Sequence, residues 1–196
     1  MMYTRFILWA LVVTVGMIGL VSGPARAKDT GVQISIPVET VADYIHAVIQ
    51  AGRAFYTIQV VERVQKQGEG VASENWRISH TLPLSAQLLN ESGELGVLTG
   101  TKVRYQLIGL WPINPGNGAH TDFERKGLEH VRVQSEERYS EIVTIGKERN
   151  FQAIYADRAV TQSCIDCHNT HPRSPKKDFK LNDVMGGILI SIPVDR

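Results

Sequence analysis

Cysteine is scarce in this sequence, and the two that it has, Cys164 and Cys167, are separated by only two residues. A disulfide between them would close a very short loop, and such a crosslink adds little stability. The composition therefore excludes a fold that is held together by disulfides. We infer that the two thiols serve a chemical purpose.

An excess of charge of one sign is also missing. The chain has 21 Lys and Arg residues against 20 Asp and Glu residues, for a formal net charge of +1. Proteins that bind nucleic acid usually show a clear excess of basic residues. The composition therefore does not favour nucleic acid as a partner.

Long apolar runs are lacking except at the amino terminus, where one extends from Phe6 to Leu20. Arg5 precedes this run, and Ala25-Arg26-Ala27 follows it with the small-x-small pattern of a signal-peptidase site. We therefore predict a signal peptide over residues 1–27 and a single domain over residues 28–196, exported to the periplasm with no stable membrane span after cleavage. An uncleaved anchor is the alternative, because roughly 15 to 17 apolar residues almost span a bilayer.

Hydrophobic periodicity predicts a long helix from about Val41 to Gln65, with Thr40 as its candidate cap and Gly68 just after its end. Two further helices are expected, and Thr121 with Glu124 has the pattern of a capping box at the start of the second. The expected ranges are 84–90 and 121–133 for these helices and 101–110, 138–145, 150–156 and 187–194 for strands. A long helix followed by several neighbouring strands favours an α+β domain with an antiparallel sheet.

The segment Cys164-Ile-Asp-Cys167-His168 matches the attachment pattern of a c-type haem. Its spacing brings two thiols to the two vinyl groups at one edge of a porphyrin, and the following histidine can then ligate the iron. This chemistry takes place after export in bacteria, which agrees with the predicted leader. We therefore predict one covalent haem c on Cys164 and Cys167, with His168 as the proximal axial ligand.

Three other interpretations of this segment remain open. The two cysteines could form a thioredoxin-like redox pair, although that motif usually follows the first strand of a βαβ unit. Cys164, Cys167, His168 and His171 could instead bind zinc, although four ligands within eight residues are cramped for a tetrahedral site. The match could also arise by chance.

The loop after the motif concentrates positive charge. Arg173 and Lys176 are candidate partners for the haem propionates, which are carboxylates. A solvated basic loop is an equally good interpretation of each residue. Pro172 and Pro175 restrict the backbone of this loop.

The run CIDCHNTHPRSPKKDFKLNDVMGGILISIPV resembles the carboxyl-terminal signature of a family of PAS-like periplasmic domains that carry a single c-type haem. Residues 42–53 and 114–117 also resemble segments of this family, whose members are free-standing bacterial and cyanobacterial proteins or sensor modules of chemoreceptors, kinases and cyclases. The resemblance implies a PAS-like antiparallel sheet with a long amino-terminal helix and flanking helices. It also implies one covalent haem.

The second axial position of the iron has several candidate ligands. We favour His46, because it lies near the apolar stripe of the long helix and because an amino-terminal helix can supply this ligand in sensor members of the family. The other candidates are a water molecule or vacancy, Met185, His80, His120, His130, His171 and Met17, the last of which would be lost with the leader. A histidine or methionine would give a saturated iron, whereas a vacancy would allow gas binding.

These observations predict a mono-haem c-type cytochrome that acts in electron transfer or redox signalling, with a redox protein as its partner. The alternative is a haem-based sensor module that binds a diatomic gas or reports redox poise. We expect no enzyme activity, because the sequence offers no acid–base group that could be placed beside an open iron. The long helix could also mediate a homodimer, or its apolar stripe could simply pack on the sheet, and the sequence leaves both alternatives open.

Overall fold

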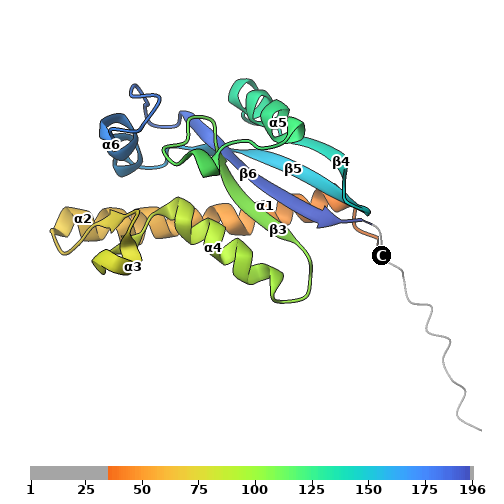
Figure 1. Cartoon of the computed structure of the whole chain (residues 1–196), viewed down its shortest axis with the longest axis horizontal. Helices are drawn as coiled ribbons and strands as arrows, with labels where there is room; N and C mark the ends of the chain where they lie inside the picture. Colours follow the sequence, from red (N-terminus) through yellow and green to blue (C-terminus); the bar gives the residue numbers. More distant parts are fainter. Residues whose placement is uncertain (1–34, 195–196) are drawn as a thin grey trace, which may run out of the picture. The chain divides into compact units, whose positions relative to one another are not determined.

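A computed structural model describes residues 35–194 of the chain, and its centre is a four-stranded antiparallel sheet (Figure 1). The strand order is β3-β6-β5-β4, with β3 at Arg104–Gly109, β4 at Tyr139–Ile145, β5 at Glu148–Arg158 and β6 at Val184–Pro193. All three strand pairs are antiparallel, as expected, and β5 and β6 occupy the centre. The expected α+β fold is confirmed.

Helices cover both faces of the sheet. Helix α1 (Val38–Phe55) and helix α4 (Ser85–Val97) pack on one face, where Ala42 and Leu89 meet Phe151, Ala153 and Ile190. Helix α5 (Asp122–Val133) packs on the other face, against strand residues whose side chains point away from α1 and α4 (Figure 1). Alternation along β5 explains this division, because successive strand residues point to opposite faces.

The long amino-terminal helix is continuous but changes its winding. Helix α1 passes directly into a π-helix, η1 (Tyr56–Glu62), and then into α2 (Arg63–Gln67). Gly68 ends it in the left-handed conformation, with φ of 69°, which confirms the predicted stop. The predicted start was late: the helix begins at Val38 after Pro37, so Thr40 lies inside the first turn and does not cap it.

The two helices predicted at 84–90 and 121–133 correspond to α4 and α5, and the elements not yet described are short. The capping box of α5 is confirmed, since the Thr121 hydroxyl accepts from the Glu124 amide at 3.1 Å and the Glu124 carboxylate accepts from the Thr121 amide at 3.2 Å. Helix α4 runs to Val97 and is therefore longer than predicted. The short elements are β1 (Ala72–Ser73), α3 (Trp76–Ser79), β2 (Leu82–Pro83) and the 3₁₀ turn η2 (Pro115–Asn117).

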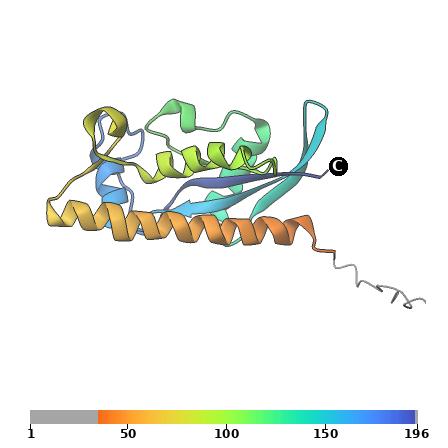
Figure 2. The same cartoon turned by 90° about the horizontal axis from the view of Figure 1, so that it is seen from below.

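The segment that carries the cysteines lies between the two central strands. Helix α6 (Gln162–Thr170) follows β5, and a loop then leads to β6. Figure 2 shows α6 beside the later part of the long helix, beyond the end of the sheet. The predicted signal peptide falls outside the described residues. Within residues 35–194, no helix is both long and apolar enough to cross a membrane.

Candidate haem-attachment site

Helix α6 holds both cysteines and the adjacent histidine. Thr161 caps the helix, and its hydroxyl accepts from the Cys164 amide at 3.4 Å. A threonine at this position stabilises a helix because it satisfies one of the free amides of the first turn. Cys164 and Cys167 are three residues apart on this helix, which places both thiols on neighbouring turns of one face. Neither thiol forms a disulfide.

The two thiols have different surroundings. Cys164 packs at the edge of an apolar cluster that contains Ile165, Phe179 and Met185. Cys167 reaches the surface and borders a depression of about 440 Å³ between α6 and the long helix. Its other lining residues include Glu62 and Lys66 of the long helix.

The pKa of the Cys167 thiol is raised, first by partial burial and then by the charges of Glu74 and Cys164. Cysteines that attack disulfides have a lowered pKa, because the thiolate is the nucleophile. The shift at Cys167 therefore argues against the interpretation of the pair as a reactive dithiol.

The imidazole of His168 lies against the ring of Phe179, with centroids 5.6 Å apart and planes at 86°. Burial and the neighbouring His171 lower the pKa of His168, which favours the neutral form that ligates metal ions. Its buried Nδ1 atom has no hydrogen-bond partner. Two thiols outside any disulfide, followed by a neutral imidazole on the same short helix, are the donor set that a c-type haem requires, so these residues fit that group.

A four-ligand zinc site receives no support from the geometry. Across residues 35–194, no three His, Cys, Asp or Glu side chains converge in an arrangement that could hold a metal ion. His171 instead lies 3.9 Å from the Glu74 carboxylate, between Nε2 and Oε1.

Arg173 and Lys176, the two candidate partners of the haem propionates, both have carboxylate partners within the chain. Arg173 pairs with Glu74, and Lys176 pairs with Asp178. Lys176 also lies 4.9 Å from the centroid of Phe179, the ring that contacts His168. Lys176 is therefore close to α6, whereas Arg173 ties the loop to the segment around Glu74.

The structure places His46 on the sheet rather than beside α6. Its ring stacks on Tyr155 of β5, with centroids 4.0 Å apart and planes at 6°. The hydroxyl of Tyr155 donates to Asp43 at 2.8 Å. Glu62, which does border Cys167, lies sixteen residues further along the same helix, roughly 24 Å away at 1.5 Å per residue. The geometry thus does not bring His46 next to His168.

The other candidates for the second axial ligand are also dispersed. Met185 is buried in the apolar cluster under α6, which makes it a core residue of this region. His120 is exposed, and its Nε2 lies 3.1 Å from the Gly116 carbonyl. His130, on α5, lies against Tyr139 of β4. His80 is exposed at the end of α3.

One structural feature near the site, a buried ion pair, could not be predicted from the sequence. A buried ion pair joins Arg53 of α1 to Asp157, at the end of β5 and four residues before the cap of α6, with nitrogen–oxygen distances of 2.7 and 2.9 Å. Burial raises the pKa of Asp157, and the Arg53 guanidinium opposes that shift. The pair fixes the long helix to the strand that leads into α6. Only the tertiary packing shows it, because the two residues are 104 positions apart.

Comparison with known proteins gives one family. The family model described as Tll0287-like matches residues 27–193. A crystal structure of the cyanobacterial heme-protein Tll0287 has a similar fold, with a TM-score of 0.53 and 15% sequence identity, over 82% of this chain and 99% of that chain. No curated protein sequence is significantly similar to the chain.

Proposed function

Because the chain belongs to the Tll0287-like family, we propose that it is a haem-binding protein with one covalent haem c, and that it acts in electron transfer or redox signalling. Tll0287, the solved protein with a similar fold, is a cyanobacterial heme-protein. The observation that best supports the proposal is the arrangement on α6, where two cysteines outside any disulfide directly precede an imidazole whose lowered pKa favours its neutral form. Bound haem would supply a one-electron iron couple.

The residues of this chain would have distinct tasks toward that group. Cys164 and Cys167 would hold the porphyrin edge through thioether bonds, and His168 would ligate the iron. Phe179 orients the His168 ring by edge contact. Lys176, which lies over Phe179, would place a positive charge on this side of the group.

Export to the periplasm is part of the same proposal. Covalent attachment of haem to such a motif takes place outside the cytoplasm in bacteria, and residues 1–27 have the pattern of a leader. A redox protein is the expected partner, because a haem iron exchanges single electrons with other redox centres.

Mass spectrometry of protein exported by a host that attaches haem tests the cofactor. We expect the mass of the mature chain plus one haem, which the double variant Cys164→Ala/Cys167→Ala should lose. His168→Ala should retain the covalent haem but change its absorption spectrum, whereas the exposed His120→Ala should change neither. An unmodified mass from the parent chain would refute the proposal.

Carbon monoxide separates the electron-transfer role from gas sensing. A low-spin ferrous spectrum that carbon monoxide leaves unchanged would support electron transfer, since both axial positions would be filled. A ferrous iron that binds carbon monoxide readily would refute electron transfer and favour the sensor alternative.

A further inference from the structure

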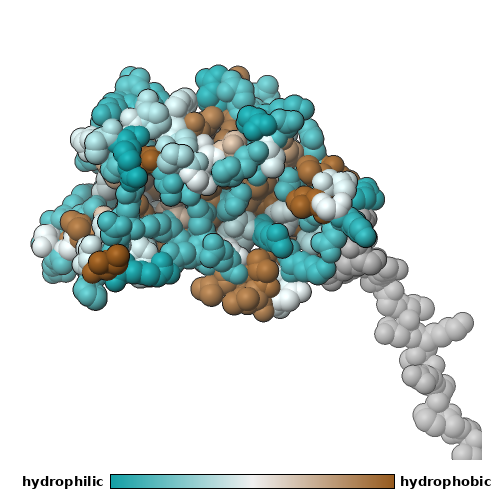
Figure 3. Space-filling model, in the orientation of Figure 1, coloured by the Kyte–Doolittle hydropathy of each residue, from teal (hydrophilic) through white to brown (hydrophobic). Residues whose placement is uncertain are grey.

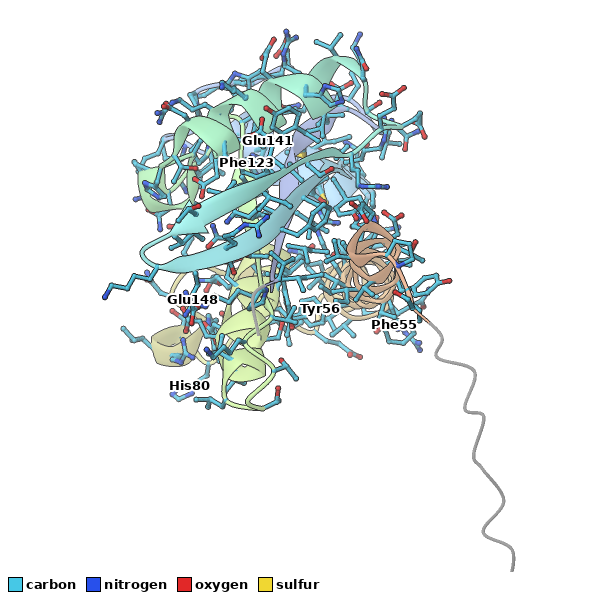
Figure 4. The ribbon with its side chains drawn as sticks, turned by 90° about the vertical axis from the view of Figure 1, so that its right-hand side faces the viewer. Phe55, Tyr56, His80, Phe123, Glu141 and Glu148 are labelled. Atoms are coloured by element: carbon cyan, nitrogen blue, oxygen red, sulfur yellow. The ribbon has the colours of Figure 1, made fainter. Side chains whose placement is uncertain are left out.

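The long helix has two apolar faces, and only one of them packs on the sheet. The inner face is buried through Ala42, Thr57 and Val61. On the outer face, Tyr44 is 64% exposed, Val48 is 74% exposed and Phe55 is 65% exposed. Figure 4 shows Phe55 on the outer side of α1, away from the sheet, whereas Tyr56 lies toward α4.

The exposed residues form a regular seam. Tyr44, Val48, Ala51, Phe55 and Ile58 follow one another at spacings of four, three, four and three residues. This is the spacing by which two helices pack along a common stripe. The seam extends roughly 21 Å at 1.5 Å per residue. We refer to these five residues as the outer seam.

The outer face of this helix also lacks charge. Residues 44–61 contain a single formal charge, that of Arg53, and Arg53 is buried against Asp157. An exposed helical surface of five turns without a charged side chain is unusual, because solvated helix faces are normally charged or polar. Depletion of charge is the compositional mark of the core of a protein–protein interface.

Gly52, next to the centre of the outer seam, is not required by close packing within the described residues. A Cβ atom at this position would meet nothing within 4 Å, and Gly52 is exposed. Glycine inside a helix costs about 1 kcal/mol relative to alanine. Close approach of another backbone to Ala51 and Gly52 would explain why the helix has such small side chains at these two positions.

We propose that the outer seam is the contact between two copies of this chain in a twofold homodimer. A stripe without charge can face itself without repulsion, and small residues at its centre suit a twofold axis near Ala51. The seam offers roughly 400–500 Å² per copy, so the pair buries roughly 800–1,000 Å², which is typical of a weak and reversible association. The proposal is independent of the haem assignment.

A second exposed apolar patch provides a matched control. Leu95 and Leu98 are 65% and 80% exposed at the end of α4, where Figure 3 shows apolar side chains gathered on the lower part of the surface. This patch is short and interrupted by glycines. A substitution there adds the same charge to the chain without touching the outer seam.

Sedimentation of the purified holoprotein over a range of about 1 to 300 μM tests the association. The parent should dimerise reversibly across this range, and Val48→Glu should weaken the dimer at least tenfold because the twofold axis introduces the charge twice. Leu98→Glu should dimerise as the parent does. A parent that stays monomeric throughout, or a Leu98→Glu variant that alone loses the dimer, would overturn the proposal.

Crosslinking then locates the interface. Ala51→Cys should form an intermolecular disulfide under mild oxidation, because residues near a twofold axis bring their Cβ atoms within the reach of such a bond. Leu98→Cys should remain largely uncrosslinked at the same concentration. Crosslinking of Leu98→Cys alone would place the contact at α4. Crosslinking of neither variant would be expected if residues 28–34 covered the outer seam. Either result contradicts the homodimer.

Discussion

Breaking the buried ion pair should strongly destabilise the protein. The side chains of Arg53 and Asp157 are 6% and 4% exposed, so neither charge can be rehydrated in place when its partner is removed. Removing one member of such a pair costs about 3–5 kcal/mol. For a domain of this size, each kcal/mol lowers the melting temperature by about 2–4 °C, so Arg53→Met should melt about 6–20 °C below the parent. Circular dichroism on the holoprotein measures this shift.

The same variant should depend on pH in a defined direction. Burial raises the pKa of Asp157, and Arg53 opposes the shift, so removing Arg53 raises the pKa of the folded state further. A carboxyl group with a raised pKa is favoured in its protonated form in the folded state. The stability deficit of Arg53→Met should therefore be small near pH 4 and should grow as the pH rises toward neutrality.

Two controls make the measurement decisive. Arg77 pairs with Glu91 at 2.7 Å on the surface, and Arg77→Met should cost about 1 kcal/mol or less. The double variant Arg53→Met/Asp157→Leu should recover most of the loss, because two buried atoms of Arg53, Nε and Nη1, lack partners even in the parent. If Arg53→Met were as mild as Arg77→Met, the description of the pair as desolvated would be refuted.

Three other substitutions test the site. Thr161→Ala should lower the free energy of unfolding by about 1 kcal/mol relative to Thr161→Ser, which keeps the capping hydroxyl; equal stability in urea melts would refute the cap. His46→Phe should leave the haem spectrum unchanged while retaining the stack on Tyr155. Because burial lowers the pKa of His46, the parent should lose stability as the pH falls below about 6.5, and this variant should lose less; a changed spin state would make His46 an iron ligand instead. Lys176→Gln should lower the reduction potential, because a nearby cation favours the reduced iron, and potentiometry that shows no decrease would separate Lys176 from the haem.

Features that depend on neighbouring residues were accessible from the sequence. The capping box of α5 and the stop at Gly68 are encoded within a few positions, so they could be predicted and are confirmed. The motif from Cys164 to His168 is local in the same sense, since both thiols and the imidazole lie on one short helix.

Features set by distant contacts were not accessible. The position of His46 depends on Tyr155, which is more than a hundred residues away, and periodicity alone could not distinguish a histidine that packs on the sheet from one that faces α6. The π-helix has no sequence pattern, and the pairing of Arg53 with Asp157 exists only after β5 has docked on α1.

The position of α6 in the chain has a consequence for the order of assembly. The segment between β5 and β6 leaves the sheet and rejoins it at one point. There the Ala159 amide donates to the Asp183 carbonyl at 2.9 Å, and the Asn182 amide donates to the Ala159 carbonyl at 3.0 Å. The central strand pair beyond this point does not need the segment for its ladder. Opening of residues 160–181 would therefore break the contacts of that segment but leave the strand ladder intact. If haem is attached to Cys164 and Cys167 after export, as we propose, a chain with a finished sheet would still present both sulfurs to an attachment enzyme. The packing of Phe179 against His168 would then follow attachment.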